Sequence, residues 1–164
     1  MGLTRDEYQT IIDNTNAASV KVAMQTDVTI ADCFESLVDN APDSTFLIFE
    51  GQTFSYAEVN QSANDYANVL LKHGVQKGDS VALMIENRVE FFYAWLGTLK
   101  VGAIAALINT EAKTRAVSHA VTTVDSRFVF VGIECFERYA SGDDRLFDMP
   151  VMLVDDAFIS SDAI

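Results

Sequence analysis

The sequence contains few cysteines and few positive charges. Its two cysteines, Cys33 and Cys135, lie far apart and form neither a Cys-x-x-Cys motif nor a cluster with a pair of histidines. This spacing argues against a zinc site and implies no disulfide framework. Lysine and arginine number 11 against 24 aspartates and glutamates, which gives a formal net charge of −13. Because nucleic-acid backbones and anionic membrane surfaces repel such a chain, this charge argues against both, and we expect no nucleic-acid partner.

A long uninterrupted apolar segment is also missing. Charged residues at positions 5, 6, 7 and 13 break up any signal-peptide core, so the cytoplasm is the expected compartment. Residues 91–108 approach the length of a membrane span and carry one charge, Lys100. The position of that charge, two glycines, and a change from aromatic to aliphatic residues at Gly102 favour a buried helix followed by a buried strand.

The composition is that of a globular protein, with 164 residues, 49% of them apolar and 21% charged. We divide the chain into an amino-terminal extension (1–28), an α/β domain (29–156) and a short polar tail (157–164). In the extension, Thr4 and Glu7 form a capping box ahead of a short apolar stripe. The chain stops just after a predicted strand, where an open α/β sheet would usually continue, and we interpret the tail as truncated.

Hydrophobic periodicity and capping residues divide the domain into helices and strands. Its first elements are a helix from Thr29 that ends before Pro42, a hairpin of residues 46–49 and 53–54 with Gly51 in the turn, and a helix from Ser55 to Gly74. The later elements are strands 81–85, 103–108, 128–131 and 151–154, and helices at 87–102, 112–124 and near Phe136.

The later strands start near residues 80, 103, 127 and 151, at intervals of 23 or 24 residues. That interval fits a strand, a crossover helix and two short loops, so we expect right-handed crossovers between parallel strands. The predicted fold class is a layered α/β/α arrangement with a mostly parallel sheet plus an amino-terminal hairpin.

Open α/β sheets bind ligands beyond the carboxyl ends of their strands. The candidate site residues at these ends are Glu86, Asn87, Asn109, Thr110, Gly132, Asp155 and Asp156. No Gly-x-Gly-x-x-Gly motif follows any strand. Gly97 and Gly102 have the glycine spacing of a phosphate-binding loop, but Ala103 and Ile104 replace its lysine and hydroxyl residue. The pairs 155–156 and 143–144 could bind Mg²⁺, although solvated acidic loops explain them better.

The histidines and the aromatic residues point to no chemistry of their own. His73 precedes Gly74 at a predicted helix end, where capping and the helix dipole explain it. His119 lies on a different predicted helix, outside any nucleophile motif. Trp95 and its aromatic neighbours could line an acyl channel, but their helical spacing is typical of a core. The residues alone therefore identify no catalytic group.

Three blocks of the chain resemble the adenylate-forming superfamily of acyl-CoA synthetases, luciferases and peptide-synthetase adenylation domains. The blocks are Thr53-Phe54-Ser55-Tyr56-Ala57-Glu58-Val59-Asn60, Gly78-Asp79-Ser80-Val81-Ala82-Leu83 with Glu86-Asn87-Arg88-Val89-Glu90-Phe91, and Trp95-Leu96-Gly97-Thr98-Leu99-Lys100-Val101-Gly102-Ala103 with Leu107-Ile108-Asn109-Thr110. Their order and spacing agree with the superfamily over about residues 29–155. Residues 85–91 and 105–110 most resemble the fatty-acid transport and very-long-chain acyl-CoA synthetase branch; a carnitine-type CoA ligase or a medium-chain synthetase shares much of this outline.

The resemblance implies a parent enzyme that uses ATP, Mg²⁺ and CoA. In such enzymes a carboxylate attacks the α-phosphate of ATP to give acyl-AMP and pyrophosphate, and the CoA thiol then displaces AMP. The family's phosphate loop with its lysine, its later ATP-contacting residues and its carboxyl-terminal lysine match no stretch of this chain. We therefore expect an amino-terminal part of a larger enzyme that is inactive by itself, with no catalytic, cofactor or metal residues.

Asn109 and Thr110 are the candidates for residues next to a ligand, although capping of the following helix is the preferred role. A fatty acid or another carboxylate would bind through subdomains outside the chain. An apolar face left uncovered by those subdomains would favour self-association. Animal members of this branch can associate with membranes, which leaves a peripheral position at the inner membrane face open. The alternative from another class is a free-standing, non-catalytic α/β interaction module.

Overall fold

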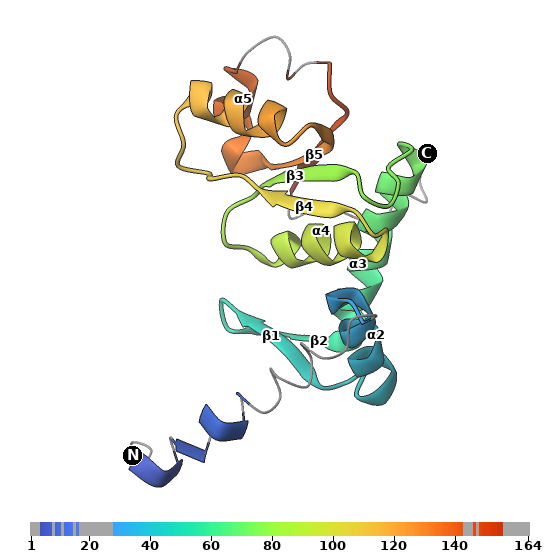
Figure 1. The fold of residues 1–164 in the computed structure, drawn as a ribbon, viewed down its shortest axis with the longest axis vertical. Coiled ribbons are helices and arrows are strands. Elements are labelled where there is room, and N and C mark those ends of the chain that lie inside the picture. The colour runs from blue at the N-terminus through green and yellow to red at the C-terminus, as the bar shows by residue number, and fades with distance from the viewer. Residues whose placement is uncertain are drawn as a thin grey trace.

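The computed structural model describes residues 4–7, 9–10, 12–14, 16, 28–142, 146 and 148–155. Within them a four-stranded parallel sheet lies between helices on both of its faces, and a two-stranded hairpin forms a second, separate sheet (Figure 1). The predicted α/β/α fold class is confirmed. The predicted capping box of the extension is also present, because the Thr4 N–H donates to Glu7 Oε2 at 2.8 Å and the Glu7 N–H donates to Thr4 Oγ1 at 3.3 Å.

The amino-terminal elements of the domain are two capped helices and the hairpin. They are α2 (Ile30–Asn40), β1 (Thr45–Phe49), β2 (Gln52–Ser55) and α3 (Tyr56–Lys72). Both predicted capping boxes form, with Thr29 and Ser55 as the N-cap residues. In the hairpin turn Glu50 and Gly51 have φ angles of 49° and 78°. Two consecutive positive φ values suit the right-handed twist of a tight hairpin.

The parallel sheet has the strand order β4-β3-β5-β6. Its strands are β3 (Ser80–Met84), β4 (Ile104–Leu107), β5 (Ser126–Gly132) and β6 (Val151–Val154), connected through α4 (Val89–Lys100), α5 (Thr114–Thr123), the 3₁₀ turn η1 (Ile133–Cys135) and α6 (Phe136–Ala140). From β3 the chain moves outward to β4 and then returns across β3 to β5. Because crossovers share one hand, these opposite moves place α4 and α5 on opposite faces of the sheet.

Each face of the sheet has its own apolar core. On one face α3 and α4 pack against the sheet, with Tyr66 of α3 next to Leu83 and Phe130 of the central strands. On the other face Val117 of α5 and Tyr139 of α6 pack against the alternate residues of the same strands. This alternation buries both sides of β3 and β5, as their apolar sequences predict.

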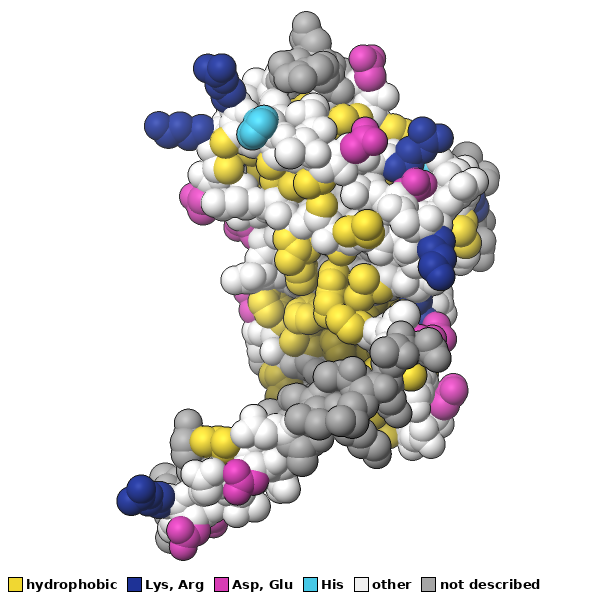
Figure 2. Space-filling view, viewed as in Figure 1, with side chains coloured by type: hydrophobic (Ala, Val, Ile, Leu, Met, Phe, Trp, Pro, Cys, Tyr) yellow, Lys and Arg dark blue, Asp and Glu magenta, His cyan; other side chains and the backbone are white. Residues whose placement is uncertain are grey.

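The prediction of a buried strand at 103–108 is wrong. Residues 91–108 do divide into a helix and a strand, and no helix among the described residues is long and apolar enough to cross a membrane. The strand β4, however, forms an edge of the sheet, where Ile104 and Leu107 are 56% and 61% exposed. Figure 2 shows apolar side chains gathered across the middle of the molecule, where Figure 1 places α4. An apolar run looks alike in a central strand and in an edge strand.

Two helix starts also differ from the prediction. The helix expected to open at Asn87 begins at Val89, with Arg88 as its N-cap. The helix expected from Ala112 begins at Thr114. Neither N-cap side chain bonds to the helix backbone. Capping preferences locate a helix start only where the side chain forms the cap, so they could not locate these two.

Candidate functional site at the carboxyl edge of the sheet

The residues predicted to follow the strands do lie along one edge of the parallel sheet. Glu86 and Asn87 follow β3, and Asn109 and Thr110 follow the neighbouring strand β4. These four residues border one open hollow of about 440 Å³, which Ile85, Ile108 and Glu111 also line. Asp155 follows β6 and is exposed. Asp156 and the pair 143–144 lie outside the described residues.

Asn109 stabilises a turn and does not cap a helix. Its Oδ1 accepts a hydrogen bond of 2.9 Å from the backbone N–H of Glu111. The next helix begins only at Thr114, with Lys113 as the N-cap. The preferred capping role is therefore wrong for Asn109, because its amide is used two residues along the chain. A ligand-adjacent role for Asn109 and Thr110 stays a prediction.

The centre of this edge is occupied by a carboxylate that the sequence did not single out. The strands β3 and β5 are neighbours whose chains continue toward opposite sides, and an open sheet usually binds its ligand between two such strands. Here Glu134, two residues beyond β5, accepts hydrogen bonds from the backbone N–H of Glu86 and from Nη1 of Arg88, each at 2.9 Å. Nε of Arg88 also donates to Glu90 at 2.8 Å. We call these four residues the Glu134 clamp.

Burial and the contacts of the Glu134 clamp shift the pKa values of Glu134 and Cys135 in opposite directions. Burial raises the pKa of the Glu134 carboxyl, but the hydrogen bonds from the backbone and from Arg88 outweigh it, so that its pKa lies below the ordinary value. The thiol of Cys135 is buried beside this carboxylate, and both effects raise its pKa to about 11. A thiol with so high a pKa is a poor nucleophile at neutral pH. The clamp therefore keeps the Glu134 carboxylate ionised beside Arg88, and the neighbouring Cys135 thiol is no reactive nucleophile.

The clamp depends on a glycine at position 132. A Cβ at Gly132 would overlap the Glu134 carboxylate and lie 2.5 Å from its Cδ. The backbone of Gly132, with φ −59° and ψ 142°, is open to any residue. A larger residue here would therefore displace the Glu134 carboxylate from the clamp, while the backbone conformation itself would accept it.

We expect Gly132→Ala to lower the free energy of unfolding by about 1–2 kcal/mol, because the displaced carboxylate loses charge-assisted hydrogen bonds. In a chain that already carries Glu134→Ala, the same change is expected to cost less than about 0.5 kcal/mol, because no carboxylate remains to be displaced. Urea unfolding of the four proteins of this double-mutant cycle measures the difference. Additive effects of the two substitutions would show that Gly132 and Glu134 act independently.

The histidines and the acidic residues supply no further centre. Nδ1 of His73 lies 2.9 Å from the Val69 carbonyl oxygen, and its ring packs edge-on against Phe128, which confirms the predicted helix-end role. His119 is exposed on α5. No three histidine, cysteine or acidic side chains among the described residues lie close enough to hold a metal ion.

Two basic side chains and a histidine lie close together at the start of α5. Lys113, Arg115 and His119 border a hollow of about 960 Å³, together with Ser118 of the same helix and Gly142 beyond α6. The first turn of α5 has no side-chain cap, and free backbone N–H groups at a helix start attract anions. Lys113 and Arg115 offset part of the net charge of −13 locally.

The fold and this edge define an open α/β domain with a parallel sheet, a class that solved adenylate-forming structures share. The N-terminal domain of FACL13 from Mycobacterium tuberculosis superposes with a TM-score of 0.70 and 27% identity, over 78% of this chain and 34% of that one. A benzoate CoA ligase from Burkholderia xenovorans has the same TM-score at 18% identity, over 78% of this chain and 26% of the ligase. At 18% identity, the similarity to the benzoate CoA ligase shows a shared fold and nothing about function.

The chain belongs to the family of AMP-binding enzymes, whose sequence model matches residues 34–160. Among curated relatives, mouse long-chain fatty acid transport protein 6 is 33% identical over 64% of this chain and 17% of its own length. A crotonobetaine/carnitine–CoA ligase of Citrobacter koseri is 33% identical over 65% of this chain and 22% of its own. The chain therefore spans about a fifth of the length of these relatives. The resemblance to acyl-CoA synthetases is confirmed.

Proposed function

We propose that this chain is the amino-terminal α/β part of a fatty acyl-CoA synthetase, which activates a fatty acid with ATP to acyl-AMP and passes the acyl group to CoA. The observation that carries the proposal is the family match over residues 34–160. Relatives named for long-chain fatty acid transport and for medium- and long-chain fatty acid–CoA ligation support the acyl class. The carnitine-type ligase of similar identity keeps another acid–CoA ligase as the alternative substrate class.

Within such an enzyme, this part serves as a scaffold. The Glu134 carboxylate links the segments that follow β3 and β5 through its hydrogen bonds with Glu86 and Arg88, where an open sheet usually binds its ligand. ATP and the acid would then be bound by residues of the parent enzyme outside this chain. In phosphoryl and adenylyl transfer, catalysis depends on donors positioned around the reacting phosphate, and no described residues form such a set here.

We expect the purified 164-residue chain to release no pyrophosphate from ATP when octanoate, palmitate or carnitine is added. The natural protein that contains it is expected to do so with at least one of the fatty acids. A coupled pyrophosphate assay of both proteins, with the acid omitted as the control, measures this difference. Turnover by the isolated chain would show that it holds a complete active site. A preference for carnitine in the natural protein would favour the alternative ligase.

The mass of the natural protein separates the enzyme from a free-standing interaction module. An antibody raised against this chain should capture a protein several times heavier than 18.0 kDa, because the relatives are roughly three to four times as long as this chain. Intact-mass spectrometry of the captured protein makes the measurement. A natural mass near 18.0 kDa would contradict the proposed enzyme and leave a binding module of the same fold.

A further inference from the structure

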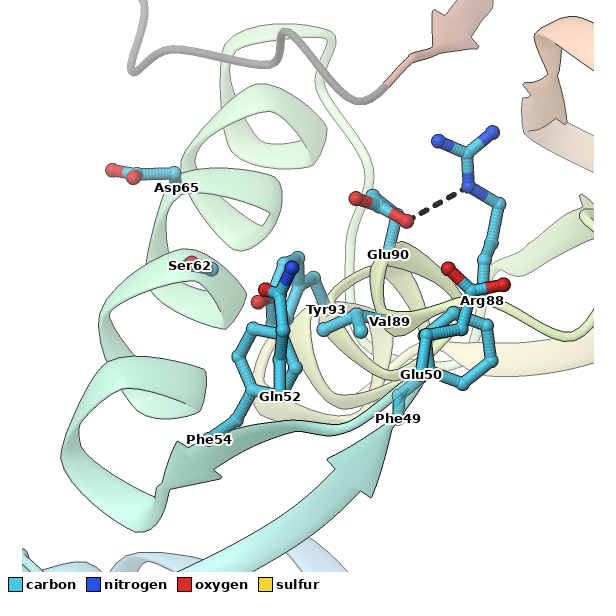
Figure 3. A pocket seen from close by; sticks show the side chains of 10 residues that line it. All are labelled: Phe49, Glu50, Gln52, Phe54, Ser62, Asp65, Arg88, Val89, Glu90 and Tyr93. Atoms are coloured by element: carbon cyan, nitrogen blue, oxygen red, sulfur yellow. Dashed lines mark hydrogen bonds and ion pairs between the residues drawn. The ribbon is translucent and has the colours of Figure 1, made fainter.

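A cleft of about 550 Å³ lies between the tip of the β1–β2 hairpin and the helices α3 and α4, and shares Arg88 and Glu90 with the Glu134 clamp (Figure 3). The hairpin contributes Phe49, Glu50, Gln52 and Phe54, α3 contributes Ser62 and Asp65, and the start of α4 contributes Arg88, Val89, Glu90 and Tyr93. Its size lies within the range of small-molecule sites. None of its residues belongs to the predicted carboxyl-edge candidates.

The interior of the cleft is aromatic. Figure 3 shows the rings of Phe54 and Tyr93 in the middle of the cleft, with Phe49 at the hairpin tip. Each of these rings is half-buried, so part of its surface faces the opening. Ser62 forms a hydrogen bond with Tyr93, and burial raises the pKa of that phenol, so it stays neutral across physiological pH. The aromatic walls therefore provide uncharged ring surface of the kind that attracts cations.

The charges around these rings are predominantly negative. Three carboxylates (Glu50, Asp65, Glu90) face one guanidinium (Arg88), which leaves two net negative charges. Arg88 and Glu90 already pair with each other. The side chains of Glu50 and Asp65 form no hydrogen bond or ion pair with any described residue, and they lie on opposite sides of the cleft in Figure 3. A cation in the cleft would meet the aromatic surface and the net negative charge of the lining.

We propose that this cleft binds a small organic cation with an apolar body, such as an aryl- or alkylammonium ion. The rings attract the cation through their faces and bury its apolar part, and the net negative charge of the lining, to which Glu50 and Asp65 contribute, attracts it over a longer range. A carboxylate ligand is disfavoured. It would have to pair with the guanidinium of Arg88, which already pairs with Glu90 and Glu134. This inference does not depend on the proposed acyl-CoA synthetase function.

The experiment titrates the 164-residue chain with three probes of one shape: 2-phenylethylammonium, 2-phenylethanol and 3-phenylpropionate. Backbone NMR shifts of residues 49–54 and 88–93 report binding. We expect the cation to bind at least about fivefold more tightly than the alcohol, and the carboxylate more weakly than both. An alcohol that binds as tightly as the cation, or a cation that shifts none of these residues, would overturn the proposal.

The charge contribution is tested with Glu50→Gln/Asp65→Asn, which removes two surface charges and leaves the core unchanged. This pair is expected to raise the dissociation constant of the cation by about fivefold and to leave that of the alcohol unchanged. The matched control is Asp125→Asn/Glu137→Gln, at the amino edge of the sheet and on its other face. At 0.15 M salt its effect is expected to stay below about twofold, because distant charges are screened. Equal weakening by both pairs would contradict a local site.

Discussion

Replacement of Gly97 by alanine is expected to lower the free energy of unfolding by about 3 kcal/mol. Gly97 lies on α4 where this helix crosses α3 at close range. A Cβ there would be 2.7 Å from the carbonyl oxygen of Ala63 and 2.8 Å from Cβ of Tyr66. Both neighbours are part of α3 and are buried, so neither can move aside by changing a rotamer. The two helices would have to separate, and the core on that face of the sheet would loosen.

Urea unfolding followed by circular dichroism measures this loss. The matched control is Asn68→Ala, an exposed position on α3, where the same new side chain is expected to change stability by less than about 0.5 kcal/mol. Alanine has the higher helix propensity, so propensity by itself predicts that Gly97→Ala stabilises the protein. If Gly97→Ala leaves the free energy of unfolding unchanged, α3 and α4 can accommodate a methyl group at their crossing.

Leu83→Ala and Leu107→Ala are expected to differ widely in cost, although both change a leucine in an apolar strand. The two residues are register partners in the neighbouring strands β3 and β4. Leu83 is 1% exposed and Leu107 is 61% exposed. Truncation of a buried leucine costs about 2–5 kcal/mol because it removes buried area and leaves a cavity. Leu107→Ala is expected to cost less than about 1 kcal/mol, since little of its side chain leaves water on folding.

The comparison is internally controlled, because both substitutions remove the same atoms on the same face of the same sheet. Equilibrium unfolding of the two variants under one set of conditions gives the difference directly. If both variants lose about 3 kcal/mol, the outer side of β4 must be covered in solution, for instance by a second copy of the chain. Sedimentation of the unmodified chain would then show an oligomer.

The sequence predicted the candidate edge but not its geometry. Residues that follow a strand can be identified from the apolar pattern, which is how Glu86, Asn87, Asn109 and Thr110 were found. Glu134 was missed because it becomes important only when β5 lies beside β3, and β4 separates these strands in the chain. Gly132 was singled out as a strand end, yet its requirement for space follows from where the Glu134 side chain lies.

Lys100 was likewise noticed in the sequence, but its contacts could be found only in the structure. In the sequence it is a lone charge inside an apolar segment, and together with two glycines and the change of residue type at Gly102 it argued against a membrane span. In the structure its ammonium group pairs with Glu35 of α2 and lies 5.9 Å from the centre of the Phe34 ring. A partner 65 positions away in the chain cannot be read from local spacing. The charge is accommodated because α2 packs against α4 and brings both contacts to it.

The sequence by itself determined the order of the elements, the α/β/α class and the family. Capping boxes, a glycine in a turn and hydrophobic periodicity each involve residues a few positions apart. Their physical cause is local, so they can be identified from the sequence. The family match has the same origin, because it rests on short blocks in a fixed order. Tertiary structure decided the rest. The strand order made β4 an edge and placed Glu134 within hydrogen-bonding distance of Glu86 and Arg88. The packing of the hairpin beside α3 and α4 formed the aromatic, acidic cleft. These features depend on contacts between distant segments, which packing of the whole domain selects.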